Sequence, residues 1–216
     1  MTTNQKTTNN MDWKSQRNLV PYEEAHQWME DRVKALQNKE ATECVWLLEH
    51  PPLYTLGTSG HNKDVLASSK LPVFKTGRGG QVTYHGPGQR VVYLMLDLKT
   101  RYEDIRRYVF ELEEWLINTL HHLGIKGGRR PGRVGIWVEK DKQEYKIAAL
   151  GVRVQKWITS HGIALNVNPD LSHYTDIIPC GLSQYGTTSL ADLGLSIDMQ
   201  EVDNILQKTY PFKPCN

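Results

Sequence analysis

A glycine-rich run over residues 77–89, with the sequence GRGGQVTYHGPGQ, restricts the possible structure of this chain more than any other segment. Five of its thirteen residues are glycine, which allows sharp turns and close approach of a ligand but costs chain entropy on folding. Thr83, Tyr84 and His85 lie between the glycines, and an apolar stretch follows at 91–96. The pattern predicts a strand, a tight turn and a second strand, with polar groups at the turn. Two interpretations stay open: the run lines a binding site, or it only makes a corner in the chain.

Strand patterns outnumber helix patterns in the rest of the chain. Apolar residues at helical spacing and capping residues predict helices from Pro21 to Leu36, from Ile105 to about Gly124, and after Asp198. Strands or extended segments are predicted at 44–48, 53–56, 73–75, 91–96, 134–138, 146–154 and 158–167. Because strands and helices do not alternate regularly, we expect a mixed β-sheet flanked by helices, which is the α+β class.

The order of these elements leaves no linker that would divide the chain. We therefore expect a single domain over 16–216, preceded by a disordered tail over 1–15 whose first ten residues are polar and carry no secretory signal. Residues 127–133, with the sequence GGRRPGR, are interpreted as a flexible basic loop.

Charge, hydropathy and cysteine usage exclude several classes of function. The net charge of +2 is too small to indicate nucleic-acid binding, and no apolar run approaches the roughly 18–20 residues of a membrane span. The three cysteines are widely spaced, which argues against a disulfide framework and for a reducing, cytoplasmic setting. Neither CxxC nor HExxH occurs, so we expect no metal site.

Three residues are candidates for chemistry. Cys180 lies between Pro179 and Gly181, a context that displays a thiol at a defined bend, whereas Cys44 lies in an apolar strand and Cys215 near the chain end. Lys146 begins an apolar strand, where it either is buried with an altered pKa or extends its ammonium to water. His161 precedes Gly162 in a strand and is either a structural hydrogen-bonding residue or part of a site.

Five motifs, in order along residues 20–190, resemble the octanoyl-acyl-carrier-protein:protein N-octanoyltransferases of lipoate synthesis. They are EHPPLYTLG at 49–57, RGGQVTYHGPGQ at 78–89, KIA with LG at 146–151, HGIALN at 161–166 and PCG at 179–181. The resemblance implies a fold shared with biotin and lipoate protein ligases, no cofactor, and a catalytic pair. In this family the cysteine of PCG, here Cys180, carries the acyl group as a thioester, and the lysine at Lys146 lies beside it and lowers its pKa.

The resemblance also assigns substrate contacts. The implied substrate-binding residues are Arg78, Gly79, Gly80, Gln81, Val82, Thr83, Tyr84, His85, Ala149, Leu150, Gly151, Gly162, Ile163 and Ala164, with His161 as a candidate supporting residue. The small residues of the two later motifs predict room for an apolar acyl tunnel between two strands, formed by Ala148, Ala149, Gly151, Gly162 and Ala164.

The implied activity is transfer of an octanoyl group from octanoyl-acyl-carrier protein to a lysine of lipoyl domains. The acceptors would be the lipoyl domains of 2-oxoacid dehydrogenases and the glycine-cleavage H protein. Both partners are expected to be acidic, so a basic cluster is either a docking face or a solvated surface: Arg106, Arg107, Lys126, Arg129, Arg130 and Arg133. Three alternatives are an ATP-dependent lipoate or biotin ligase, an amidotransferase between lipoyl-type domains, and a non-catalytic carrier-binding module.

Overall fold

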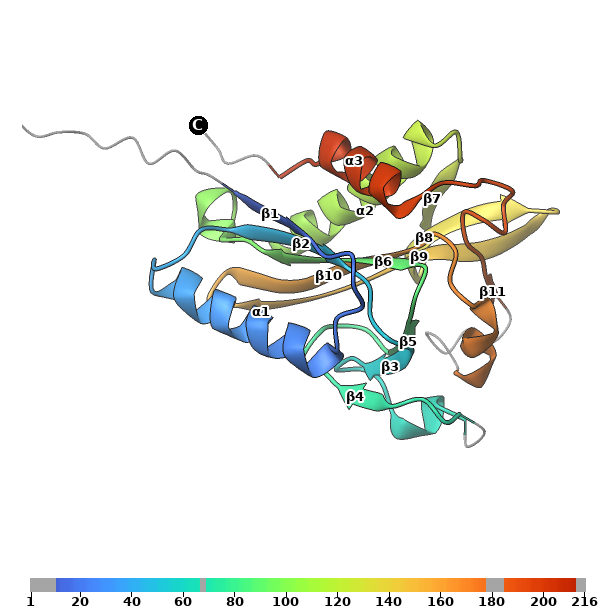
Figure 1. Ribbon diagram of the computed structural model, residues 1–216. Helices are drawn as coiled ribbons and strands as arrows, with labels where there is room; N and C mark the ends of the chain where they lie inside the picture. Colours follow the sequence, from blue (N-terminus) through green and yellow to red (C-terminus); the bar gives the residue numbers. More distant parts are fainter. Residues whose placement is uncertain (1–10, 67–68, 178–184, 213–216) are drawn as a thin grey trace, which may run out of the picture.

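A computed structural model describes residues 11–66, 69–177 and 185–212. Its main element is an eight-stranded sheet of order β1-β2-β6-β10-β9-β8-β7, with β11 beside β9 (Figure 1). The strands of this sheet are β1 (Asp12–Ser15), β2 (Cys44–Leu48), β6 (Gln89–Met95), β7 (Gly127–Arg130), β8 (Arg133–Lys140), β9 (Gln143–Gln155), β10 (Ile158–Asn166) and β11 (Gly186–Thr187). The β1–β2 and β9–β11 pairs are parallel and the others antiparallel, so the sheet is mixed, as predicted.

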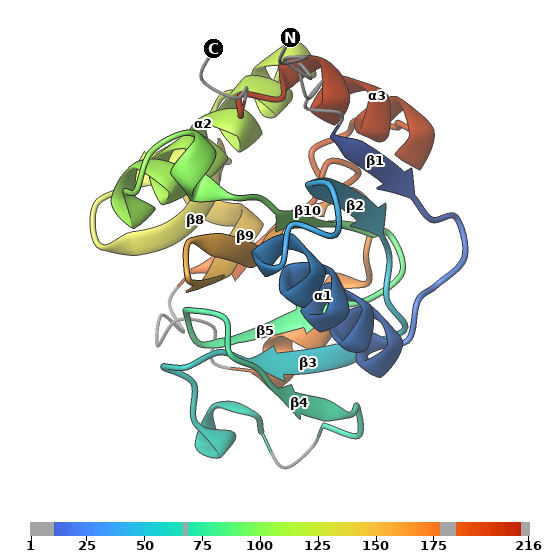
Figure 2. The same cartoon turned by 90° about the vertical axis from the view of Figure 1, so that its left-hand side faces the viewer.

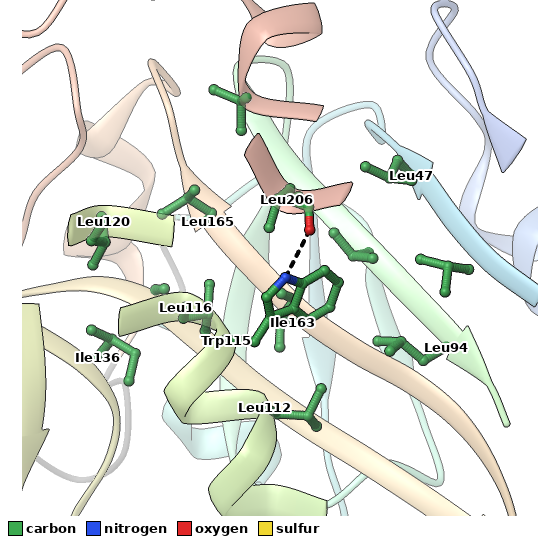
Figure 3. Packing of buried hydrophobic residues seen from close by; sticks show 14 of the residues in the cluster. Leu47, Leu94, Leu112, Trp115, Leu116, Leu120, Ile136, Ile163, Leu165 and Leu206 are labelled. Carbon is green, nitrogen blue, oxygen red and sulfur yellow. Dashed lines mark hydrogen bonds between the residues drawn. The ribbon is translucent and has the colours of Figure 1, made fainter. Parts of the chain in front are cut away.

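Helices cover both faces of the large sheet. Helices α2 (Ile105–His122) and α3 (Met199–Thr209) lie on one face and α1 (Tyr22–Gln37) on the other (Figures 1 and 2). The core under α2 contains Leu112, Trp115 and Leu116, none of which is exposed, and the indole Nε1 of Trp115 donates to the Leu206 carbonyl at 2.9 Å (Figure 3). This bond ties α2 to α3 while both helices bury apolar side chains against the sheet.

A second, three-stranded sheet lies below the large one, on the side of α1 (Figure 2). Its order is β4-β3-β5, formed by β4 (Val73–Lys75), β3 (Leu53–Leu56) and β5 (Val82–His85). The loop between β4 and β5 carries the first half of the glycine-rich run, and the turn between β5 and β6 carries the second half. The run therefore leads from the small sheet into the centre of the large one.

Two of the predicted segments are wrong. Residues 127–130 form β7, paired with β8, and not a flexible loop. The Pro131-Gly132 turn that follows explains the loop-like sequence. Gly127 packs so closely on α2 that a Cβ there would lie 2.5 Å from Leu120 Cδ1, which favours glycine at this position of the strand. The tail predicted over 1–15 extends too far, since residues 12–15 form β1. Short strands of this kind depend on distant partners: Ser15 Oγ donates to an Asp203 carboxylate oxygen at 2.8 Å.

No helix in the described ranges is both long enough and apolar enough to cross a membrane.

Candidate active site

A cavity of about 420 Å³ lies where the glycine-rich loop and β5 face β9 and β10 of the large sheet. Most residues implied as substrate contacts line it, although they are distant in sequence. The predicted residues found there are Arg78, Gly80, Gln81, Val82, Thr83, His85, Lys146, Ala149, Leu150, Gly151, His161, Gly162, Ile163 and Ala164. The structure places two others elsewhere, Gly79 and Tyr84. Cys180 lies outside the described residues.

Small residues on the two neighbouring strands form one wall of the cavity. The β9–β10 register pairs Ala149 with Ala164 and Gly151 with Gly162, and all four line the cavity. Lys146 lies on β9, five residues before Gly151, which is roughly 17 Å of strand. β9 therefore lines the cavity from Lys146 at one end to Gly151 at the other.

The glycine-rich loop is fixed to this wall through its main chain. The Gly79 amide donates to the Val152 carbonyl of β9 at 2.9 Å. Gly151 permits this contact, because a Cβ at that position would lie 2.8 Å from the Gly79 carbonyl oxygen. Gly80 has φ of +87°, in the left-handed region that favours glycine. Gly79 is thus a backbone anchor of the loop and does not line the cavity.

Arg78 holds the loop against the small sheet. Its guanidinium donates to the Thr55 carbonyl at 2.8 Å, the Thr55 hydroxyl at 2.7 Å and the Gln81 carbonyl at 2.9 Å. Arg78 is only 8% exposed. It bridges β3 and the loop, and it also brings a positive charge to the cavity wall.

Tyr84 points away from the cavity, into the core of the small sheet. It is 1% exposed and packs among Tyr54, Leu56 and Ile177. Its ring centroid lies 4.8 Å from that of His173. Alternation along β5 explains the difference from its neighbours, since side chains of successive strand residues point to opposite faces. Thr83 and His85 face the cavity and Tyr84 faces the core.

Buried, neutral histidines lie at one end of the cavity: His85 and His161 line it, and His50 packs behind them against Tyr93 and His85. His50 Nδ1 donates to the Val20 carbonyl at 2.6 Å, and its Nε2 accepts from the Tyr93 hydroxyl at 2.7 Å. His85 Nδ1 donates to Gln89 Oε1 at 2.7 Å, and its Nε2 accepts from the Thr55 hydroxyl at 3.2 Å. Burial is the main cause that lowers the pKa of His50 to about 4 and of His85 to about 3.

His161 is the third histidine at this end, and its backbone is strained. Its φ of +59° lies in the left-handed region, which costs a non-glycine residue about 1–2 kcal/mol. Its ring meets Tyr93 edge-on at 5.9 Å, and burial, with the charge of Arg78 second, lowers its pKa to about 3. Both interpretations of His161 remain compatible with this position, because it packs as a buried ring and also lines the cavity.

The other end of the cavity contains Lys146. The β8–β9 register pairs Lys146 with Trp137, and a register shift separates this pair from the next, Ile136 with Ala148. Gly135 has φ of +115°, and a Cβ there would lie 2.4 Å from Lys146 Cε. The absence of a side chain at Gly135 therefore makes the space that the lysine side chain occupies.

Several cavity residues were not predicted from the sequence. Thr55 and Asn166 lie within two of the family motifs, but the resemblance assigns them no role. Tyr22, Trp137 and Tyr185 also line the cavity, and no local pattern marks them. They come from the start of a helix, a strand and a loop that only the tertiary structure brings together.

The predicted basic cluster is largely neutralised within the protein. Arg129 pairs with Glu113 at 2.6 Å and with Glu114. Arg130 and Arg133 both pair with Glu144, whose pKa is lowered by these hydrogen bonds. Because β7 and β8 hold these arginines beside acidic residues, the surface offers less positive charge than the sequence suggests.

The fold and the cavity define a class of protein. Residues 21–210 match the family described as "Lipoyl protein ligase A/B catalytic domain". A bipartite lipoate protein ligase from Thermoplasma acidophilum superposes with a TM-score of 0.69 at 15% identity, over 93% of this chain and 83% of that one. A lipoate-protein ligase A bound with ATP gives 0.68 at 16% identity, over 93% and 84% of the two chains. The predicted biotin and lipoate ligase-like fold is thereby confirmed.

Sequence relatives narrow the class. Octanoyltransferases from Nitrobacter winogradskyi and Parvibaculum lavamentivorans are 54% and 55% identical, over 93% and 92% of this chain and 89% and 90% of theirs. The octanoyltransferase from Paramagnetospirillum magneticum is 55% identical over 93% of this chain and 95% of its own. The chain belongs to the octanoyltransferase family, and it is an acyltransferase.

Proposed function

We propose that the protein transfers an octanoyl group from octanoyl-acyl-carrier protein to the ε-amine of a lysine on lipoyl domains, the first step of endogenous lipoate synthesis. One observation carries the proposal: a cavity with small residues along one wall has Lys146 at one end, in a chain 54–55% identical to octanoyltransferases. The acceptors proposed are the lipoyl domains of 2-oxoacid dehydrogenases and the glycine-cleavage H protein.

The dimensions of the cavity suit an eight-carbon chain. An extended octanoyl group is roughly 10 Å from carbonyl to methyl at bond lengths of about 1.5 Å. It therefore fits within the roughly 17 Å of β9 between Lys146 and Gly151. Burial of its methylenes, at about 0.8 kcal/mol each, contributes roughly 5 kcal/mol to binding. The neutral histidines at the far end suit an uncharged chain better than protonated ones would.

The reaction proceeds in two acyl transfers. The Cys180 thiolate attacks the thioester carbonyl of the donor, a new C–S bond forms, and the carrier's thiolate leaves. The lysine amine of the acceptor then attacks the enzyme thioester, a C–N bond forms, and the C–S bond to Cys180 breaks. The second step ends in the more stable amide, so neither step requires ATP.

Lys146 has two roles in this proposal. Its ammonium stabilises the Cys180 thiolate, since a nearby cation lowers the pKa of a thiol. A decrease of about 2 units in the pKa of the Cys180 thiol would raise its thiolate fraction at pH 7 about 25-fold. The less basic thiolate is also a weaker nucleophile, which lowers the rate roughly 6- to 10-fold. The net effect on the first step is only severalfold, so Lys146 also moves protons. Its ammonium gives a proton to the departing carrier thiolate in the first step, and the neutral amine that remains takes a proton from the incoming ammonium in the second step.

A second candidate function is favoured by the structural neighbours, which include lipoate-protein ligases. Such a ligase would activate a free acid with ATP and would not need Cys180.

One experiment separates the candidates. The purified protein is incubated with octanoyl-acyl-carrier protein and its intact mass is recorded, with and without ATP. An octanoyl adduct that forms without ATP and is absent in Cys180→Ser supports the transferase. Acylation of a lipoyl domain only from free octanoate and ATP supports the ligase. An adduct formed from octanoylated lipoyl domains, and not from the carrier, supports the amidotransferase.

A further inference from the structure

Two buried hydrogen-bond donors at the Lys146 end of the cavity have no acceptor within the described part of the chain. They are Nε1 of Trp137 and Nη1 of Arg133, and both residues line the cavity. Trp137 is only 3% exposed. Buried donors in native proteins are nearly always satisfied, so each such atom in a cavity wall points to a partner that binds there.

Arg133, Trp137 and Tyr185 form one cluster, here called the aromatic rim. The Arg133 guanidinium lies 4.8 Å from the centroid of the Trp137 ring and 4.2 Å from that of Tyr185. The two rings meet edge-on with centroids 5.5 Å apart. Trp137 is also the register partner of Lys146, so the two side chains stand on the same face of neighbouring strands, about 5 Å apart. The aromatic rim therefore lies one strand away from the proposed reacting group.

The chemistry of the two donors favours a neutral acceptor. Trp137 offers a single uncharged N–H. Arg133 already pairs with the Glu144 carboxylate, so its charge is compensated and a further anion is not required. An amide carbonyl satisfies such donors, and the ring faces can pack against the methylenes beside it.

We propose that the aromatic rim binds the amide-bearing arm of the thioester donor. This inference rests on the proposed function, in which the octanoyl group arrives on a pantetheine-type thiol. In that thiol, two methylenes and a nitrogen separate the sulfur from the first amide carbonyl, a span of roughly 5 Å. A thioester at Lys146 thus places that carbonyl beside Trp137. A lysine acceptor offers only methylenes at that distance, so the aromatic rim distinguishes donor from acceptor.

The test compares donors that differ only in the arm. Rates of Cys180 acylation are measured by intact mass with octanoyl-pantetheine, octanoyl-N-acetylcysteamine, and an octanoyl thioester of ethanethiol, which has no amide. In Trp137→Phe we expect the second-order rate constant to fall about two- to tenfold for the two amide-bearing donors, the typical effect of one lost hydrogen bond. The rate with the ethanethiol thioester should not change.

Trp46→Phe is the matched control. Trp46 is 2% exposed and its Nε1 also has no acceptor among the described residues, but it packs in the core on the α1 side and does not line the cavity. This variant should keep the wild-type preference for amide-bearing donors. Arg133→Met, which keeps most of the apolar stem, should reduce the preference as Trp137→Phe does.

An equal loss with all three donors, or no loss with any, would overturn the proposal for the aromatic rim while leaving the proposed function intact. Absence of acylation in the wild-type protein with every donor would refute the proposed function, and the arm subsite with it.

Discussion

The buried histidines make the stability of this protein depend on pH in a defined window. His50, His85 and His161 have pKa values lowered from 6.5 to about 4, 3 and 3, chiefly by burial. In the unfolded chain they take up protons near pH 6.5, whereas in the folded protein they stay neutral far below that. The unfolded state therefore binds more protons as the pH falls, and the free energy of unfolding must decrease.

The size of this decrease in the free energy of unfolding follows from the histidine pKa in the unfolded chain. Between pH 7.5 and 5.5 each such histidine reduces the free energy of unfolding by about 1.4 kcal/mol, provided that its folded pKa lies well below 5.5. The three together remove about 4 kcal/mol, a large share of a typical total of about 5–15 kcal/mol. For a chain of this size the melting temperature should fall by roughly 8–16 °C. Carboxylates with lowered pKa, such as Glu144, contribute only at lower pH.

Urea unfolding followed by fluorescence between pH 5.5 and 7.5 measures the effect. His85→Gln should remove about a third of the pH dependence, while His121→Gln, at the exposed end of α2, serves as the control and should leave it unchanged. The reasoning is refuted if the unfolding midpoint is independent of pH in this range. It is equally refuted if ring protons of His50, His85 and His161 titrate near pH 6.5 by NMR.

Three further predictions concern the site. Gly135→Ala should lower octanoyl transfer at least tenfold, because its Cβ would meet Lys146 Cε at 2.4 Å; Gly194→Ala, also at positive φ but with nothing within 4 Å and outside the cavity lining, controls for backbone strain. Ala164→Leu should shift the preferred donor to chains shorter than eight carbons, and an unchanged profile of acyl-chain lengths would contradict a tunnel along β9 and β10. Lys146→Arg should form the acyl-enzyme but transfer it slowly to a lipoyl domain; single-turnover transfer at the wild-type rate would exclude a role as base.

The sequence predicted correctly those strands whose own residues form a clear apolar run. The strands at 44–48, 53–56 and 73–75 have the predicted bounds, because their apolar runs are bordered by turn residues. β1 and β7 were missed because neither DWKS nor GGRR alternates apolar and polar residues. The partner of β1 is distant in sequence, while β7 forms a hairpin with the adjacent β8.

The residues of the candidate site likewise fall into two groups: those that the family motifs indicate and those that only the tertiary structure reveals. Motif residues such as Arg78 and Ala149 were found from the resemblance, and the structure brings them to one cavity. Tyr22 and Trp137 could not be found, since each sits in an ordinary apolar pattern and gains its place only when α1 and β8 pack around the cavity. Tyr84 was grouped with the site because the resemblance implies substrate contacts for all of residues 78–85, but alternation along β5 turns its side chain into the core.

The anchoring of the glycine-rich loop has a consequence for engineering. The loop is held by the Gly79 amide on β9 and by Arg78 on main-chain carbonyls and Thr55, so its path does not depend on the side chain of Gln81, while Thr83 is held in strand β5 by its pairing with β3. Those two residues face the cavity. A library of substitutions at these two positions would vary the cavity lining without changing the path of the loop. This segment is therefore suited to redirecting the enzyme toward other acyl groups.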